Sequence, residues 1–521
     1  MSLRPARARA AAAVLTALLI VTASASTAFG NDIAESKGFR KAVTVAGIRE
    51  HQAALQAIAD ANNGIRLAGT NGYDESAEYV YEHAAAAGYD VSYQEFEFLL
   101  VSDRTPPVFQ QISPTAASYV DGVDFGTMQY SGSGDVTAPV ALPAGNALGC
   151  YAADFAGFPA GSIALVQRGT PAGFPGGVCT FRIKADNAMA AGATAVLIYN
   201  NVPGGGAFGT LGAPMHALPV LSVSLPLGQE LAALVPGGLT VRVRTDTVAE
   251  TRTTRNVIAE TPGGDPDNVV VVGAHLDSVS RGPGINDNGS GSGTILEIAE
   301  VYAAQDRTPR NKLRFIWFGA EELGLVGSNF YVASLDAAER EQIMAMVNFD
   351  MVGSPNYVRF VYDGDGSATS PAGPPGSGFI EDVFVDYFNS QGLASDPTQF
   401  SGRSDYGPFI AVGIPAGGLF TGAEVPKTVA QAQVYGGTAG LAYDPCYHLA
   451  CDTFAGTGSG AGATAPGLGI KALDEMSDAA AHAVLFLSRT KVDIGATAAA
   501  ALRTSGSPAS ADFDDHDAVT H

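Results

Sequence analysis

The chain has 521 residues, of which 52 are Asp or Glu and 29 are Lys or Arg, so its formal net charge is −23. This acidic balance argues against a nucleic-acid-binding protein and against unassisted binding to anionic membranes. Hydrophobic residues make up 46% of the chain, which excludes a largely disordered protein. At roughly 100–200 residues per domain, we expect two or three domains.

The N-terminus has the features of a secretory signal peptide over residues 1–25. Basic residues precede an apolar run over residues 10–21, and small residues follow at positions 23–25. The apolar run is too short for a membrane-spanning helix, which needs about 20 residues. We therefore expect a secreted, extracellular protein with no membrane partner.

Two amphipathic helices and a strand are predicted next. Hydrophobic residues recur at helical spacing from Ile48 to Ala59 and again from Ala77 to Ala84. Gly88 stands where the second helix should end, and a strand is predicted around Val91–Phe98. These elements should begin the first domain.

The composition changes over residues 121–245, which are rich in Gly and Pro. Short strands are predicted at Ile163–Val166 and Ala195–Tyr199, with a helix over Phe181–Ala191 between them. We interpret this stretch as a mostly β domain inserted into the first domain. The first domain would then comprise residues 31–120 and 246–490.

Strands and helices alternate from residue 256 onward. Continuous apolar runs at Val269–Val272, Leu313–Phe318 and Met344–Val347 are typical of strands buried on both faces. A helix around Ile295–Tyr302 separates the first two. This alternation predicts an α/β fold, with a mostly parallel mixed sheet and helices on both faces. Residues 491–521 are rich in Ala and Ser and then acidic, which predicts a disordered tail.

The chain has four cysteines, and in an exported protein an even number predicts disulfides. Four cysteines allow three pairings. Proximity in the sequence favours Cys150 with Cys179 and Cys446 with Cys451.

Side chains that can bind metal or move protons follow each of the three buried strands. The first strand leads into His275 and Asp277, the second into Glu321 and Glu322, and the third into Asp350. Ligands of open α/β sheets bind outside the carboxyl ends of the strands. We therefore expect these side chains to lie together at one edge of the sheet.

Two loops complete this set of side chains. Asp287 lies in a glycine-rich loop before a helix, and His448 lies between the last two cysteines. Imidazoles and carboxylates without a thiolate suit two zinc ions if one carboxylate bridges them. The expected ligands are His275, Asp287, Glu322, Asp350 and His448. Glu321 then stays free as a base, and Asp277 can orient a ligating imidazole.

We expect the other histidines to take no part in this chemistry. His51 and His83 should face solvent from the first two helices. The remaining four lie in an Ala-rich helix, in the inserted domain and in the tail: His482, His216, His516 and His521. Trp317 is predicted to be a core residue, because it lies in a buried strand.

The chain resembles the secreted co-catalytic dizinc aminopeptidases of the bacterial leucyl-aminopeptidase and aminopeptidase Y type. The segments that carry the resemblance are NVVVVGAHLDSV (268–279), GPGINDNGSGSG (282–293), FIWFGAEELGLVGS (315–328), NFDMVG (348–353), GRSDYGPF (402–409) and DPCYHLACD (444–452). Residues 66–91 resemble the first helices of that family. The inserted domain, with segments 161–169 and 179–200, resembles a protease-associated (PA) domain.

This resemblance implies the zinc exopeptidase fold and two Zn²⁺ ions per chain. One zinc would be held by His275 and Asp350, the other by Glu322 and His448, and Asp287 would bridge them. Family members often have a second Asp after the bridging one, where this chain has Asn288. That difference leaves the bridge intact and changes the charge beside it. No motif in the sequence supports a structural Ca²⁺ ion.

The resemblance also implies a mechanism. Glu321 would be the general base that takes a proton from a water held between the zinc ions and passes it to the leaving amine. Asp277 would orient a zinc ligand, and the Tyr447 hydroxyl would stabilise the tetrahedral intermediate.

The expected substrates are peptide or protein N-termini, and we expect a monomer. Glu321, Asp350 and carbonyl groups near Arg403 would bind the free ammonium group. The other candidate substrate-binding residues are apolar and suit a Leu-like side chain: Met351, Phe409 and Phe420. The inserted domain would be a lid or would shape the substrate site, unless it is a passive insertion.

Three other functions remain open from the sequence. A carboxypeptidase could use the same metal site, with Arg403 facing the substrate carboxylate. A glutaminyl-cyclase-like enzyme would bind one zinc instead of two. A non-catalytic binding protein of the same fold should have lost ligands, whereas this chain retains all five and the base.

Overall fold

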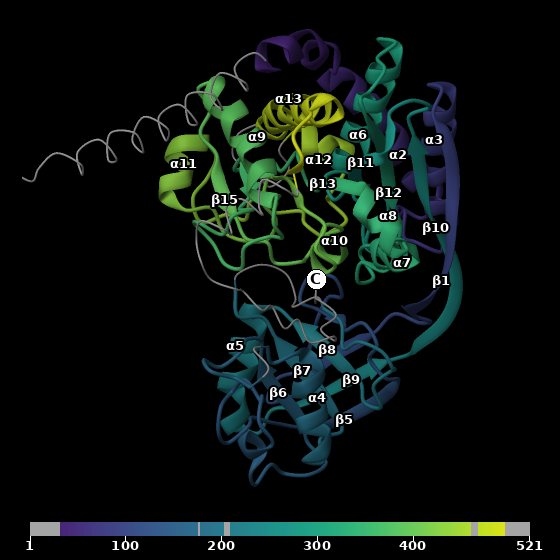
Figure 1. Cartoon of the computed structure of the whole chain (residues 1–521). Coiled ribbons are helices and arrows are strands. Elements are labelled where there is room, and N and C mark those ends of the chain that lie inside the picture. Colours follow the sequence, from purple (N-terminus) through teal and green to yellow (C-terminus); the bar gives the residue numbers. More distant parts are fainter. Residues whose placement is uncertain (1–31, 176–177, 203–208, 460–466, 495–521) are drawn as a thin grey trace, which may run out of the picture.

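The structure of the protein, a computed structural model, describes residues 32–175, 178–202, 209–459 and 467–494. The expected signal peptide and the expected tail beyond residue 494 lie outside the described residues. Two eight-stranded sheets organise the chain. Figure 1 shows the two units one above the other, joined along one side by the long strands β1 and β10.

The first sheet is mixed, and the strands at its centre are parallel. Its order is β1-β10-β12-β11-β13-β16-β14-β15. The neighbours β12, β11, β13 and β16 run parallel, whereas β1 and β10 pair antiparallel along their whole length. The strands are β1 Asp90–Asp103, β10 Thr247–Glu260, β11 Asp265–His275, β12 Asn311–Phe318, β13 Ile343–Phe349, β14 Phe360–Tyr362, β15 Asp396–Thr398 and β16 Ala416–Phe420. The predicted fold class is confirmed.

Helices cover both faces of this sheet. Val270 and Val272 of β11 pack with the larger group of helices, and Val269 and Val271 pack on the other face. Burial on both sides explains the continuous apolar run, since successive strand residues point to opposite faces. Trp317 is fully buried in the larger core, as predicted. Besides a helical segment over residues 32–42, the helices of this unit are α2 Val45–Ala61, α3 Asn71–Ala86, α6 Gly289–Ala304, α7 Val326–Ser334, α8 Ala337–Gln342, α9 Ser377–Ser390, α10 Gly407–Ala411, α11 Val429–Tyr435, α12 Phe454–Ser459 and α13 Leu468–Arg489.

The second sheet forms a separate unit with its own core. Its order is β3-β2-β9-β5-β6-β7-β8-β4, and β5 to β8 run parallel. The strands and helices are β2 Val108–Ser113, β3 Ala117–Ser118, β4 Phe125–Thr127, β5 Gly134–Ala141, η1 Ala152–Phe155, β6 Ile163–Gln167, α4 Phe181–Ala190, β7 Ala195–Tyr199, β8 Val220–Val223, α5 Leu225–Leu234, η2 Val235–Gly237 and β9 Thr240–Thr245. The boundary expected at residue 121 is too late for this sheet, because β2 pairs with β9.

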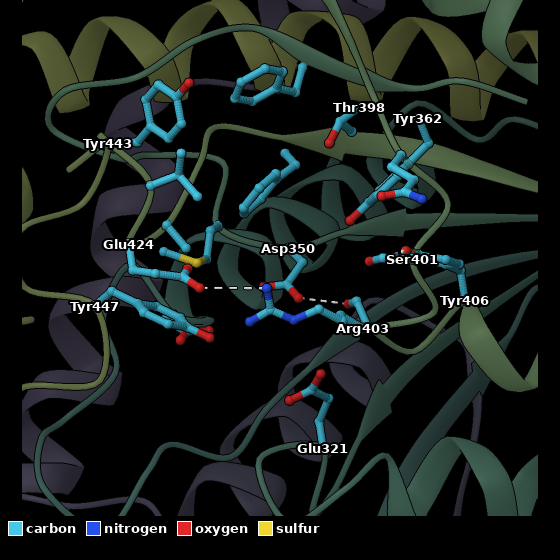
Figure 2. A pocket seen from close by; sticks show the side chains of 18 of the residues that line it. Glu321, Asp350, Tyr362, Thr398, Ser401, Arg403, Tyr406, Glu424, Tyr443 and Tyr447 are labelled. Atoms are coloured by element: carbon cyan, nitrogen blue, oxygen red, sulfur yellow. Dashed lines mark hydrogen bonds and ion pairs between the residues drawn. The ribbon is translucent and has the colours of Figure 1, made fainter. Parts of the chain in front are cut away.

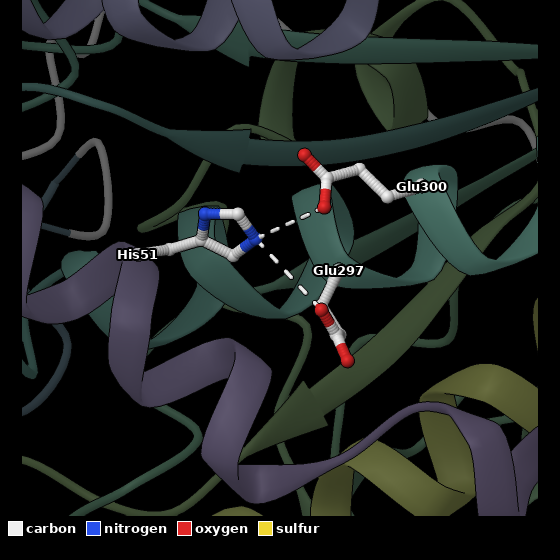
Figure 3. Close-up of side chains that lie close together, drawn as sticks. All are labelled: His51, Glu297 and Glu300. Carbon is white, nitrogen blue, oxygen red and sulfur yellow. Dashed lines mark ion pairs between the residues drawn. The ribbon is translucent and has the colours of Figure 1, made fainter. Parts of the chain in front are cut away.

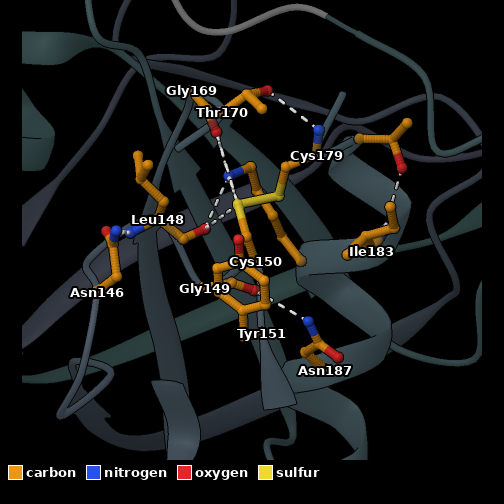
Figure 4. The surroundings of a disulfide bond; sticks show 12 residues. Asn146, Leu148, Gly149, Cys150, Tyr151, Gly169, Thr170, Cys179, Ile183 and Asn187 are labelled. Atoms are coloured by element: carbon orange, nitrogen blue, oxygen red, sulfur yellow. Dashed lines mark hydrogen bonds between the residues drawn. A yellow bond between two sulfur atoms is a disulfide. The ribbon is translucent and has the colours of Figure 1, made fainter. Parts of the chain in front are cut away.

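Both disulfides that sequence proximity favours are present. Cys150 is bonded to Cys179 in the second unit, and Cys446 is bonded to Cys451 in the first. Figure 4 shows that the first disulfide lies between the loop at Leu148 and the segment before α4. Among the described residues, no helix has the length and hydropathy that a membrane span requires.

Candidate metal centre

The carboxyl edge of the first sheet gathers the predicted donor groups. His275 is the last residue of β11, Glu321 and Glu322 follow β12, and Asp350 follows β13. Asp287 lies in the loop that leads into α6. Because β11 lies between β12 and β13, the residues after these strands reach the same edge.

The distances divide the donors into two halves that share one carboxylate. The Nε2 atom of His275 lies 3.2 Å from Oδ1 of Asp287 and 3.4 Å from Oδ1 of Asp350. The Nε2 atom of His448 lies 3.2 Å from Oδ2 of Asp287 and 3.0 Å from Oε2 of Glu322. Each oxygen of Asp287 thus faces a different imidazole.

The backbone around these residues is constrained. Ala320, Met351 and His448 have φ values of 59°, 49° and 59°, in the left-handed region that non-glycine residues rarely adopt. The Tyr447 ring stacks on the His448 ring, with centroids 3.7 Å apart. The disulfide between Cys446 and Cys451 closes the short loop that contains both rings. Strained backbone of this kind is typical of functional sites.

Asp277 holds two of the donor segments together. The Nδ1 atom of His275 lies 3.2 Å from the carbonyl oxygen of Asp277 and 3.6 Å from the Asp277 carboxylate. The same carboxylate accepts hydrogen bonds from the backbone N–H groups of Glu321 at 3.1 Å and Glu322 at 3.3 Å. Asp277 therefore orients the imidazole and the glutamate pair at once.

Further polar side chains support the centre, although no role was predicted for them from the sequence. The Asp452 carboxylate accepts hydrogen bonds from the backbone N–H groups of Asn286 at 2.7 Å and Asp287 at 3.0 Å. Ser404 donates to Oδ2 of Asp350 at 2.6 Å. The segments 402–409 and 444–452 contain Ser404 and Asp452, but nothing in these segments indicates which group each one holds.

Arg66 is a buried positioning residue that the sequence analysis also missed. Its guanidinium donates to the carbonyl oxygens of Pro283 at 2.8 Å and Gly284 at 2.7 Å, and to that of Leu276. It therefore ties the segment after His275 to the loop that carries Asp287. Its place at the start of segment 66–91 marks it as part of a motif, but not as a partner of these loops.

The centre concentrates negative charge in a buried place. Burial raises the pKa of Glu322 to about 7 and that of Asp405 to about 7, and it also raises the pKa of Glu321. Burial acts to lower the pKa of His448, but the charges of Glu322 and Asp287 raise it to about 10. Such a group of carboxylates is stabilised by cations.

The donor set fits zinc. Oε1 of Glu322 and Oδ1 of Asp350 are buried and accept no hydrogen bond among the described residues. The donors also lie close enough for shared ligation: His275, Glu321 and Asp350 place one atom each within 4.8 Å of one another, and so do His275, Asp287 and Glu322. Imidazole nitrogen and carboxylate oxygen are both common zinc ligands.

A cavity of about 440 Å³ opens beside these carboxylates. Figure 2 shows Glu321, Asp350, Arg403 and Tyr447 around this cavity, with the guanidinium group of Arg403 directed toward Glu424. Arg403 forms an ion pair with Glu424 at 3.5 Å. The predicted residues Met351 and Phe420 line the cavity, together with further apolar or aromatic side chains: Phe360, Tyr362, Tyr406, Val425 and Tyr443.

The structure corrects two of the expectations from sequence. Phe409 does not line the cavity, because it is fully buried against Phe318 and Tyr331. His51 does not face solvent, because its face of α2 packs on α6 and leaves it 4% exposed. His83 is half-buried beside it.

Family models and related sequences identify the same two domains and the same kind of enzyme. The model of peptidase family M28 matches residues 256–465, and that of the PA domain matches residues 136–231. An aminopeptidase of Pseudomonas aeruginosa is 47% identical over 413 residues, which span 77% of this chain and 75% of that protein. Leucine aminopeptidase 2 of Trichophyton rubrum is 44% identical over 414 residues, with 78% and 79% covered.

Solved structures give the same result. An aminopeptidase from Aneurinibacillus sp. strain AM-1 superposes with a TM-score of 0.66 at 28% identity, over 88% of this chain and 97% of that one. A zinc aminopeptidase from Bacillus subtilis superposes with a TM-score of 0.61 at 26% identity, over 87% and 97%. The resemblance seen in the sequence segments is confirmed: the chain belongs to peptidase family M28 and carries a PA domain.

Proposed function

We propose that the protein is a secreted, zinc-dependent aminopeptidase that removes Leu-like hydrophobic residues from peptide N-termini. The observation that supports this most is the position of the Asp287 carboxylate. Each of its two oxygens lies 3.2 Å from a different imidazole. The names of the relatives, an aminopeptidase and a leucine aminopeptidase, agree with the proposed reaction and side-chain preference.

In this proposal the five donors hold two Zn²⁺ ions. His275 and Asp350 would hold one, Glu322 and His448 would hold the other, and Asp287 would be shared by both. Bound zinc lowers the pKa of a coordinated water to about 7 and polarises a carbonyl group. Asp277 keeps the His275 imidazole in the orientation that ligation requires, through its contacts with Nδ1.

Glu321 and Tyr447 are the proposed proton carrier and oxyanion donor. Glu321 is buried at the edge of the cavity and within reach of both His275 and Asp350. Its carboxylate takes a proton from the attacking water and returns it to the leaving amine. Tyr447 lines the same cavity, and its hydroxyl donates a hydrogen bond to the developing oxyanion.

Among the cavity residues that would not ligate zinc, Glu321 is left for an ammonium group, whereas the one arginine is not free for a substrate carboxylate. The cavity lining includes five carboxylates and one arginine: Asp287, Glu321, Glu322, Asp350, Glu424 and Arg403. The arginine is already paired with Glu424. A substrate N-terminus would therefore bind near Glu321 and Asp350, and its side chain would pack against Met351 and Phe420.

Two substrates with opposite blocking groups test the reaction. We expect rapid release of the anilide from leucine p-nitroanilide and no hydrolysis of an N-acetylated peptide with a free C-terminus. Cleavage of the N-acetylated peptide from its C-terminus, with leucine p-nitroanilide untouched, would show a carboxypeptidase instead. Glutamic acid and lysine anilides give the side-chain preference, and a leucine rate below both would contradict the Leu-like pocket.

Secretion is supported by the signal-peptide features of residues 1–25 and by the two disulfides. N-terminal sequencing of protein from the culture medium should begin near residue 26. An intact N-terminus on protein found inside cells would contradict export. Light scattering after size exclusion should give the mass of one chain.

A further inference from the structure

A second group of potential metal ligands lies away from the sheet edge, between helices α2 and α6. Figure 3 shows His51 on α2 facing Glu297 and Glu300 on α6. We propose that these three side chains bind a third divalent cation, Zn²⁺ or a similar transition ion. The proposal goes beyond the peptidase site, because none of the three residues lines the cavity beside it.

The distances suit an ion better than a direct contact. Nε2 of His51 lies 3.9 Å from Oε2 of Glu297 and 3.8 Å from Oε2 of Glu300. Both separations are too long for hydrogen bonds. Neighbouring ligand atoms of a tetrahedral zinc lie about 3.4 Å apart, given bonds of about 2.0–2.2 Å. A small inward movement of the two carboxylates would therefore complete the site.

The Nε2 atom of His51, which faces the two glutamates, is buried and has no hydrogen-bond partner among the described residues. The His51 side chain is 5% exposed. The other nitrogen, Nδ1, lies 2.8 Å from the Tyr79 hydroxyl. When Nδ1 donates this hydrogen bond, the lone pair of Nε2 points toward the two carboxylates. A bound cation would satisfy all three groups.

Each glutamate is likewise held at its outer oxygen. Oε1 of Glu297 accepts hydrogen bonds from the backbone N–H of Thr44 at 3.1 Å and from its hydroxyl at 3.3 Å. Oε1 of Glu300 lies 2.6 Å from Nδ1 of His83. Outer contacts that orient ligands in this way are a regular feature of metal sites.

The cluster lacks another source of positive charge. Within the described ranges, the ion pairs of Glu297 and Glu300 involve histidines alone, and the Glu297 side chain is 10% exposed. Burying carboxylates without a cation is costly.

The ligand types favour a transition ion over calcium, since calcium prefers oxygen ligands alone. At a rise of about 1.5 Å per residue, Glu297 and Glu300 lie about 12–17 Å along α6 from Gly289. The ion would therefore be structural. It would fasten α2 to the helix that begins directly beside the Asp287 loop.

Counting metal in matched variants of the full chain tests the proposal. After chelation and reloading with excess Zn²⁺, followed by gel filtration, elemental analysis should give one zinc ion fewer in His51→Gln than in wild type. Glu297→Gln should also lose one, whereas His83→Gln, which removes an outer contact, should keep it. Turnover of leucine p-nitroanilide should change less than twofold in all three, because the peptidase site is untouched.

A second measurement uses only the wild-type chain and so does not depend on how well the variants fold. With the wild-type chain, Zn²⁺ titrated beyond the amount that restores full peptidase activity should raise the thermal midpoint further, in a saturable step. Equal zinc counts in wild type and both ligand variants, or no such step in the wild type, would overturn the proposal. Either result would leave a hydrogen-bonded cluster with a proton in place of the ion, without affecting the proposed peptidase function.

Discussion

The two sheets of this protein have similar architecture and very different strand ends. Both contain parallel strands at their centre with helices packed on them. In the first sheet, the strand ends lead into His275, Glu321 and Asp350. In the second, β6 and β7 lead into Arg168 and Asn200, which hydrogen-bond to each other at 3.2 Å. Parallel topology supplies an edge where side chains meet, and the residue types there decide whether it can bind metal.

Buried charge differs in the same way. The second unit buries Lys184, whose ammonium donates to the carbonyl oxygens of Leu148 at 2.7 Å and Gly169 at 2.8 Å, beside the disulfide shown in Figure 4. That charge is satisfied by the protein itself. The metal centre instead leaves buried carboxylate oxygens of Glu322 and Asp350 without a hydrogen bond in the described part of the chain. The first arrangement stabilises a fold, and the second suits a ligand.

The largest effect should come from changing Asp287, the carboxylate that both halves of the proposed zinc site share, since no change in the second sheet should affect metal binding. Asp287→Asn would weaken both halves of the centre, because each Asp287 oxygen faces one imidazole. We expect loss of bound zinc and a fall in kcat/KM of at least about 10³-fold. The matched change Asp135→Asn, on an exposed side chain of the second sheet, should leave both values unchanged. Wild-type zinc content and activity in Asp287→Asn would contradict the shared-ligand geometry.

A smaller loss is expected when the orienting carboxylate is changed. The Asp277→Asn amide keeps one acceptor oxygen, so it can no longer accept hydrogen bonds from both the Glu321 and Glu322 N–H groups. It also removes the negative charge beside the His275 imidazole. Zinc affinity, measured by competition with a chelator, should fall about 10–100-fold. Asp267 lies on β11, the strand that leads to Asp277, and is exposed, so Asp267→Asn should have no effect. Equal affinities in the two variants would remove Asp277 from this role.

A substitution in the core of the second unit should lower the stability of the protein and leave its peptidase activity unchanged. Lys184→Met leaves two part-buried carbonyl groups without this donor, so the free energy of unfolding should fall by about 1–3 kcal/mol. Chemical denaturation should detect this, while turnover of leucine p-nitroanilide stays unchanged. The exposed Lys471→Met should alter stability by less than about 0.5 kcal/mol. A large loss of turnover in folded Lys184→Met would show that the two units are coupled.

The smallest effect concerns a buried histidine outside the metal centre. Burial, with the charge of Arg40, lowers the pKa of His482 to about 4. The unfolded chain then binds the proton first, so this stability is present above about pH 6.5 and is lost as the pH falls toward 4. Between pH 7 and 5.5, wild type should lose about 1 kcal/mol more unfolding free energy than His482→Gln. Equal losses would mean that His482 titrates normally.

Several parts of this account could be predicted from the sequence because they depend on local pattern. Continuous apolar runs identified β11, β12 and β13, and parallel neighbours necessarily bring His275, Glu321 and Asp350 to one edge. The pairing of Cys446 with Cys451 followed from proximity. These inferences needed no knowledge of which elements pack together.

Other features depend on tertiary packing and could not be predicted. His51 was expected to face solvent, but α6 covers its face of α2. Phe409 was expected in the pocket, but the short helix α10 directs it into the core, against Phe318 and Tyr331. Arg66 crosses to two loops more than 200 positions away, a contact for which the sequence carries no spacing signal.

The central claim, that a dizinc centre uses Glu321 as its base, is tested most directly by one variant measured in two ways. For Glu321→Gln, we measure zinc per chain by elemental analysis and kcat on leucine p-nitroanilide in the same preparation. We predict the same zinc content as in wild type, with kcat lowered about 10²–10⁴-fold. Full zinc content with wild-type turnover would contradict this claim.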